Sequence, residues 1–171
     1  MSEGVPIAVR RPVVRLPLRM AQPKVYFVPP NSIARTVNRI YGRLTALGLS
    51  PCYSYLALTQ GRKTGILRST PLNLLRHGEK LYLVATRGQT HWARNALAAG
   101  ELTLCRGRTS QTFRLSTVPE ETKAPILKAY LMRYHWMAWR FFPVPQGAPL
   151  SDFAAIANRY PVFELVPDLP G

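Results

Sequence analysis

A glycine-bounded turn at residues 61–65 carries the residue types best suited to binding an anion. Its sequence is Gly-Arg-Lys-Thr-Gly, and Arg-Ser-Thr-Pro follows at residues 68–71. The two glycines allow positive φ and bring backbone N–H groups close to an anion, while Arg62 and Lys63 add positive charge. Arg68 can donate two parallel hydrogen bonds to a phosphate or carboxylate. Alone, such a turn is more often a solvated hairpin tip, so its neighbours decide between the two interpretations.

A second candidate segment spans residues 86–97, with the sequence Thr-Arg-Gly-Gln-Thr-His-Trp-Ala-Arg-Asn-Ala-Leu. Arg87 and Gly88 lead into the start of a predicted helix, where unpaired N–H groups and the helix dipole favour an anion. Trp92 and Asn95 are three residues apart on that helix and therefore share a face. The alternative is that Trp92 anchors the core and Asn95 ties down a loop. Because the two basic turns lie on neighbouring strands, we expect them to converge on one ligand.

The charge distribution supports an anionic partner. The chain has 23 Lys and Arg against 8 Asp and Glu, a net charge of +15. The excess is concentrated before residue 119, and the remainder of the chain is balanced. Such a field fits a phosphorylated cofactor, an acidic lipid surface or a nucleic acid, and charge alone does not choose among them.

The elements that must position these residues are short strands linked by turns. Hydrophobic alternation predicts strands, and 3.6-residue periodicity with Thr90 and Gly100 as caps predicts helices. Hairpin links rather than repeated βαβ units favour an antiparallel sheet curled into a barrel, an α+β fold that is mainly β. The predicted strands are 54–60, 66–76, 81–85, 102–106, 111–117 and 162–165, and the predicted helices are 91–99, 120–134 and 151–158.

The N-terminal region is predicted to differ from the barrel. Residues 1–30 are rich in Pro and Arg and are expected to form an irregular basic arm. Residues 31–171 are expected to form one domain that begins with an amphipathic helix ending at Gly48. Arg35, Arg39 and Arg43 form a cationic stripe on that helix. The stripe either faces water or contacts an anionic membrane surface.

Four segments, in order, resemble the deazaflavin-dependent nitroreductase family: TQGRKTGILRSTPL, HGEKLYLVATRG, HWARNAL and YPVFELVP. The resemblance runs from about Tyr55 to Val166. It implies a split β-barrel related to flavin reductases. It also implies binding of the coenzyme F-420 (8-hydroxy-5-deazaflavin), with FMN as the alternative, and hydride transfer to a flat acceptor such as a quinone or nitroaromatic.

The same resemblance assigns roles to the two basic segments. Residues expected to hold the coenzyme phosphate are Arg62, Lys63 and Thr64, with Arg68 assisting. Thr70 and Pro71 are expected to border the ring, and the residues expected to close the other side are Arg87, Gly88, Trp92 and Asn95. Family members often have Lys-Gly-Gly where this chain has Arg-Gly-Gln at residues 87–89. Their tyrosine-rich substrate side is replaced here by residues 134–142.

A reaction in which the coenzyme supplies the hydride needs no protein nucleophile. The chain contains no GxSxG or HExxH motif, and its carboxylates form no obvious catalytic pair. A proton for the reduced substrate could come from Tyr134, His135 or solvent. Six aromatic residues lie within positions 130–142, and this cluster either lines a pocket mouth or forms a small core at the end of the barrel.

Other functional classes are disfavoured. Cys52 and Cys105 form no metal-ligand cluster, so no metal site is expected. No apolar stretch is long enough to span a bilayer, and the first twenty residues do not resemble a secretory signal, so a cytoplasmic location is expected. No RNA- or DNA-binding motif supports a nucleic-acid partner. The remaining rival is a flavin, deazaflavin or lipid binding protein on the same scaffold without turnover.

Overall fold

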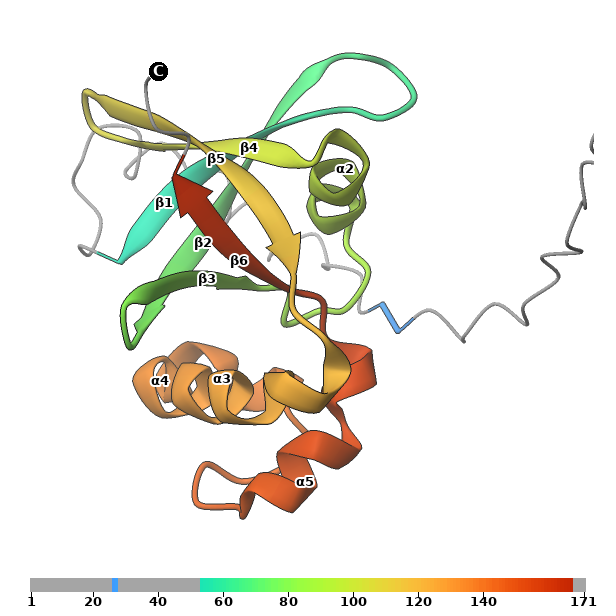
Figure 1. Cartoon of the computed structure of the whole chain (residues 1–171), viewed down its shortest axis with the longest axis vertical. Helices are drawn as coiled ribbons and strands as arrows, with labels where there is room; N and C mark the ends of the chain where they lie inside the picture. The colour runs from blue at the N-terminus through green and yellow to red at the C-terminus, as the bar shows by residue number, and fades with distance from the viewer. Residues whose placement is uncertain (1–25, 28–52, 168–171) are drawn as a thin grey trace, which may run out of the picture.

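The computed structural model describes residues 26–27 and 53–167 (Figure 1). Strand ends agree with the sequence prediction to within two residues. The elements are β1 (Ser54–Gln60), β2 (Leu67–His77), β3 (Lys80–Val84), α2 (His91–Ala99), β4 (Glu101–Arg106), β5 (Thr109–Thr117), α3 (Glu120–Arg133), α4 (His135–Ala138), the 3-10 helix η1 (Trp139–Phe141), α5 (Leu150–Ala155), the 3-10 helix η2 (Ala157–Arg159) and β6 (Val162–Pro167).

The strands of the described region form a closed antiparallel barrel in the order β1-β2-β3-β6-β5-β4. The circle closes where β4 pairs with β1, with Ala57 opposite Leu104. The hairpins β1–β2 and β4–β5 are those predicted from the sequence. Alternating side chains from these strands point inward and fill the barrel, so the predicted α+β barrel with surrounding helices is confirmed.

Helix α2 covers one end of the barrel (Figure 1). Its predicted caps are both present: the Thr90 side chain accepts a hydrogen bond from the Ala93 N–H, and Gly100 has φ 74° and donates to the Ala96 carbonyl. Trp92, Ala93 and Ala96 are buried in the barrel cluster. The edge of the Trp92 ring packs on Phe163 with centroids 5.8 Å apart. The caps and the apolar face therefore fix α2 against the barrel.

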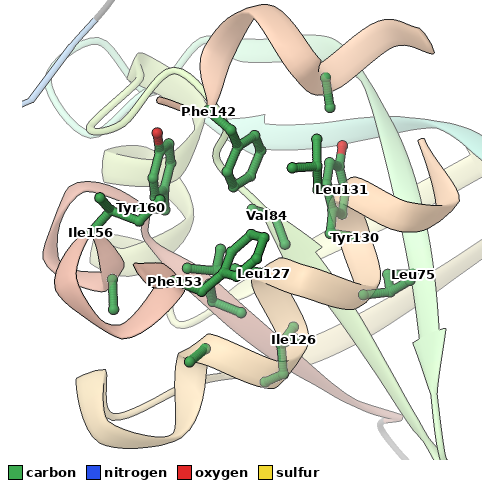
Figure 2. Close-up of a cluster of buried hydrophobic side chains, with 14 of the residues drawn as sticks. Leu75, Val84, Ile126, Leu127, Tyr130, Leu131, Phe142, Phe153, Ile156 and Tyr160 are labelled. Carbon is green, nitrogen blue, oxygen red and sulfur yellow. The ribbon is translucent and has the colours of Figure 1, made fainter. Parts of the chain in front are cut away.

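The remaining helices form a second layer outside the barrel, and Figure 2 shows their shared core. Leu127 and Leu131 of α3 pack there with Phe153 of α5. The sequence-predicted helix over 151–158 is wrong in one respect, because it divides at Ile156 into α5 and η2. The buried Ile156 has φ −109° and ψ 0°, and its N–H bonds to the Phe153 carbonyl. This tighter turn ends the α-helix while keeping the side chain in the core.

The aromatic segment is divided between this core and the surface. Tyr134 and Phe142 are buried, and Phe142 stacks on Tyr160 at 4.7 Å between centroids. Trp136 and Trp139 are instead 61% and 58% exposed. Neither sequence interpretation describes the whole segment, because part of it is core and part faces solvent.

Part of the N-terminal arm contacts the barrel. Phe27 forms an antiparallel β-bridge with Gly88, and the Gln89 N–H donates to the Tyr26 carbonyl at 2.7 Å. The rest of the arm and the predicted helix with Arg35, Arg39 and Arg43 lie outside the described residues. Among the helices of the described region, none is long and apolar enough to cross a membrane.

Candidate active site

The predicted basic turn at residues 61–65 joins β1 to β2 and is closed by its own backbone. The Gly61 N–H donates to the Ile66 carbonyl at 2.9 Å, and the Gly65 N–H donates to the Gly61 carbonyl at 2.7 Å. The Thr64 hydroxyl accepts a weak hydrogen bond from the Ile66 N–H at 3.4 Å. Thr64 therefore holds the turn together, while the exposed side chains of Arg62 and Lys63 are available to a ligand.

The turn is tied directly to α2. The Arg62 Nη1 donates a 3.0 Å hydrogen bond to the Asn95 Oδ1, and the Arg62 backbone N–H approaches the same oxygen at 3.4 Å. Asn95 is buried, with 4% of its surface exposed. These bonds bring the two predicted segments together, as expected, although the residues are 33 positions apart.

Two cavities are lined by residues of α2. The first, called the basic pocket, has a volume of about 300 Å³ and is lined by Gln60, Gly61, Arg62, Lys63, Gly65, Asn95, Ala98 and Ala99. None of these lining residues is acidic. Among its described lining residues, the basic pocket therefore presents two cationic side chains with no carboxylate to compensate them, which favours an anionic ligand.

The second cavity, called the aromatic pocket, has a volume of about 310 Å³. Trp92 lines it, and Asn95 lines the basic pocket one helical turn further along α2, so the two cavities are neighbours. Thr90 and His91 place the positive end of the α2 dipole at its wall. Its lining residues are Phe27, Thr70, Pro71, Leu72, Thr86, Arg87, Thr90, His91, Trp92 and Phe141.

Arg87 and Arg140 lie over the same aromatic ring at the aromatic pocket. Their guanidinium carbons are 4.8 Å and 5.8 Å from the Phe141 ring centroid. Burial, and then the positive charge of Arg140, lowers the pKa of Arg87 from its ordinary value. Neither arginine is ion-paired within the described residues. Positive charge is therefore concentrated beside an apolar wall, where it acts more strongly than in water.

Tyr160 positions the segment that brings Phe141 into this pocket. Its hydroxyl donates a 2.6 Å hydrogen bond to the Phe141 carbonyl. Desolvation by burial is the largest cause of the raised pKa of Tyr160, so the hydroxyl keeps its proton and remains a donor. The rings of Tyr26 and Tyr160 pack edge to face, with their centroids 5.7 Å apart. The Tyr160 side chain thus supports both the contact with Tyr26 of the N-terminal arm and the position of Phe141 in the aromatic pocket.

The second basic turn, at residues 87–89, requires a residue without a side chain at Gly88. Its φ is +78°, and a Cβ at this position would overlap the carbonyl of Tyr26. The Gly88 N–H donates to the Ala85 carbonyl at 2.9 Å. Glycine therefore both permits the turn and lets the arm approach. Gly88 shapes the wall through its backbone, and its neighbour Arg87 provides the charge.

The other predicted site residues lie elsewhere. Arg68 is exposed on β2 opposite Thr59 and lines neither pocket. The Tyr134 hydroxyl donates to the Leu74 carbonyl at 2.7 Å, and its side chain lines a different cavity. His135 is exposed at the start of α4. The structure therefore does not bring Tyr134 and His135 into either pocket.

The residues of the aromatic pocket that were not among the expected site residues are Phe27, Leu72, Thr86, Thr90, His91 and Phe141. Of these, Phe141 belongs to the aromatic cluster for which one interpretation was a pocket mouth. His91 adjoins Trp92 at the predicted helix start, a position that could have drawn attention to it. Phe27 and Phe141 reach the pocket only through long-range contacts with Gly88 and Tyr160. No local pattern in the sequence signals those contacts.

Solved structures share this fold. The chain is similar to Atu2129, a protein of unknown function from Agrobacterium tumefaciens, with TM-score 0.52 and 14% identity over 84% of this chain and 58% of that one. It thus spans little more than half of that protein's length. Other similar structures are an F420-H2 dependent reductase, FDR-A (TM-score 0.46, 19% identity, 67% and 94% covered), and HutZ, the heme storage protein from Vibrio cholerae (0.49, 8%, 77% and 88%).

At such identities the structural similarity to Atu2129 shows the fold alone. No curated protein matches the chain in sequence. A family model described as F420H(2)-dependent quinone reductase, however, matches residues 33–137, which is more than half of the chain. This match includes both basic turns and the helix that joins the two pockets. The chain therefore belongs to this F420H(2)-dependent quinone reductase family.

Proposed function

We propose that the protein transfers a hydride from reduced F-420, bound across the basic and aromatic pockets, to a flat acceptor of the quinone class. The observation that carries this proposal is the hydrogen bond between Arg62 and Asn95, which ties the basic turn to α2, the helix that lines both pockets. We also propose that residues 31–171 form one catalytic domain.

The residues of the two pockets fit the chemistry of this coenzyme. Its phosphate and glutamyl tail are anionic and match the basic pocket, where Arg62 and Lys63 are not opposed by any lining carboxylate. Its ring is flat and largely apolar and matches the aromatic pocket, where Trp92 and Phe141 provide aromatic surface. Thr70 and Pro71 line the same pocket on β2. With the coenzyme tail in the basic pocket and the ring in the aromatic pocket, residues of both predicted segments would contact the coenzyme.

When bound in its reduced form, F-420 supplies the hydride. Phe27, Trp92 and Phe141 exclude water from the place where the ring and the acceptor meet. Arg87 stabilises the negative charge that develops on the acceptor oxygen after the hydride is added. A quinone that gains one hydride and one proton becomes a hydroquinone, so the site must also deliver a proton.

The position of His91 makes it our proposed proton donor. It lines the aromatic pocket and is exposed to solvent, so it can be reprotonated after each turnover. Tyr134 is less suitable because it is buried and donates its hydrogen bond to the Leu74 carbonyl. His135 is exposed but lines neither pocket. Their positions therefore favour His91 over the two donors expected from the sequence.

A peripheral contact with an anionic membrane surface is part of the proposal. Trp136 and Trp139 are exposed three residues apart, and the exposed Arg140 precedes Phe141 at the aromatic pocket. Tryptophan and arginine are favoured at membrane interfaces. No acidic residue occurs between Glu121 and Asp152. Such a contact would place the pocket near membrane-dissolved quinones.

The direct test is turnover with purified full-length protein. Reduced F-420 is mixed with enzyme and with a water-soluble naphthoquinone, a nitroaromatic or no acceptor, and coenzyme oxidation is followed by absorbance. We expect saturable oxidation with the naphthoquinone and a large loss of kcat in His91→Gln. If F-420 binds but no acceptor accelerates its oxidation, the protein is a coenzyme-binding protein and the proposed reductase activity is wrong.

A further inference from the structure

A third cavity lies at the end of the barrel opposite to α2 and has a volume of about 730 Å³. It is called the barrel-end cavity. Its described lining comes from the start of β1, the last residues of β2, the first residues of β3, the strands β4 and β5, and the end of α3 with Arg133, next to the β2–β3 and β4–β5 turns. Figure 1 shows these turns on the far side of the barrel from α2. In the part of the chain that the structure describes, the cavity shares no lining residue with the basic or aromatic pocket.

The floor of the barrel-end cavity is apolar. Leu104 and Phe113 are buried members of the barrel cluster, and Tyr55, Leu74 and Leu81 pack against that cluster. An apolar chain placed here would therefore contact the hydrophobic interior of the barrel. The volume lies within the range of roughly 300–1,000 Å³ that is usual for small-molecule sites.

The rim of the same cavity is polar and positively charged. Arg76 and Arg133 line it together with Thr109, Ser110 and Gln111, and none of the described lining residues is acidic. The Arg133 guanidinium carbon lies 5.9 Å from the Tyr53 ring centroid. Within the described residues neither arginine is ion-paired. Two guanidinium groups above an apolar floor match a ligand with one anionic head and one apolar chain.

We infer that the barrel-end cavity binds a long-chain carboxylate, with its alkyl chain on the apolar floor and its head at the rim formed by Arg76 and Arg133. The aromatic pocket also combines an arginine, Arg87, with an apolar wall, but its volume of about 310 Å³ is less than half that of the barrel-end cavity. The chain supplies affinity through burial of apolar surface. The two arginines supply selectivity for the charged head.

Isothermal titration calorimetry on the full chain tests this inference, with dodecanoate below its micelle concentration as the probe. We expect saturable 1:1 binding of dodecanoate and at least about tenfold weaker binding of dodecan-1-ol, because the alcohol lacks the charge. From octanoate to dodecanoate, affinity should rise by up to about fourfold for each added methylene. Equal affinity for the alcohol and the carboxylate, or no saturable binding, overturns the inference.

Variants locate the site. Arg76→Met and Arg133→Met should each weaken dodecanoate binding by about fivefold or more, and the matched control Arg159→Met, on η2 outside the cavity, should not. Ser110→Asp should also weaken binding by placing a negative charge at the rim without removing an arginine. The Arg62→Ala/Lys63→Ala variant should bind dodecanoate like the wild type. If all the rim variants bind like the wild type, or the Arg62/Lys63 variant loses binding, the site is not the barrel-end cavity.

Discussion

Arg62 on the β1–β2 turn donates a 3.0 Å hydrogen bond to Asn95 on α2. The donor is exposed, whereas the acceptor is buried against the barrel. A buried amide oxygen with a charged donor holds that donor in one orientation. Asn95 therefore fixes how Arg62 faces the basic pocket, and the pair ties this pocket to α2, which also lines the aromatic pocket.

Because Asn95 orients Arg62, Asn95→Ala is predicted to weaken F-420 binding although Asn95 carries no charge. The variant should also lose about 1–3 kcal/mol of unfolding free energy, because it removes a buried hydrogen bond. A double-mutant cycle with Arg62→Ala checks the mechanism by coenzyme titration and urea unfolding. If the two affinity losses simply add, Asn95 does not act through Arg62.

Trp92→Ala is predicted to lower both stability and coenzyme affinity. Trp92 is 7% exposed and packs on Phe163, so its removal should cost about 3–5 kcal/mol of unfolding free energy. Trp92→Phe should keep most of the stability and still weaken F-420 binding by reducing the aromatic wall. Thermal unfolding and coenzyme titration separate the effects. An unchanged affinity in Trp92→Phe would assign Trp92 to the core alone.

Gly88→Ala is predicted to destabilise the second basic turn by more than about 1 kcal/mol, since it combines positive φ with overlap of the Tyr26 carbonyl. Gly78→Ala is the matched control: Gly78 has φ +60°, but a Cβ there meets nothing within 4 Å. The control should lose less stability and keep its F-420 affinity. Similar losses in both variants would show that contact with the N-terminal arm is unimportant.

The membrane proposal predicts that Trp136→Ser/Trp139→Ser reduces sedimentation with vesicles containing anionic lipid. Ile66→Ser/Leu67→Ser removes residues of comparable exposure, 59% and 63%, from the β1–β2 hairpin and serves as the control. Sedimentation should persist in the control and weaken with salt. If the wild-type protein never sediments with such vesicles, the membrane contact is absent.

Much of the barrel could be predicted because its signals are local. Alternation at residues 54–60 and the caps Thr90 and Gly100 define elements within their own sequence. The contact between the basic turn at residues 61–65 and the segment at residues 86–97 was also expected, since the turn leads into β2 and the segment follows β3, the neighbour of β2. The aromatic wall was predictable only in part: Phe141 belongs to the cluster interpreted as either a pocket mouth or a small core, but Phe27 and Phe141 are positioned by partners distant in sequence. Periodicity likewise cannot show that the Tyr134 hydroxyl is bonded to the Leu74 carbonyl.

The basic turn is proposed to bind F-420. A titration of reduced F-420 with wild-type protein and with Arg62→Ala/Lys63→Ala tests this most directly. The variant loses the hydrogen bond from Arg62 to the buried Asn95, so it should unfold at a lower temperature than the wild type but remain folded at the temperature of the titration. We predict at least about tenfold weaker binding in the variant, from the loss of charge-assisted hydrogen bonds, and unchanged affinity in the control Arg159→Ala. A folded variant with wild-type affinity for F-420 would contradict the account.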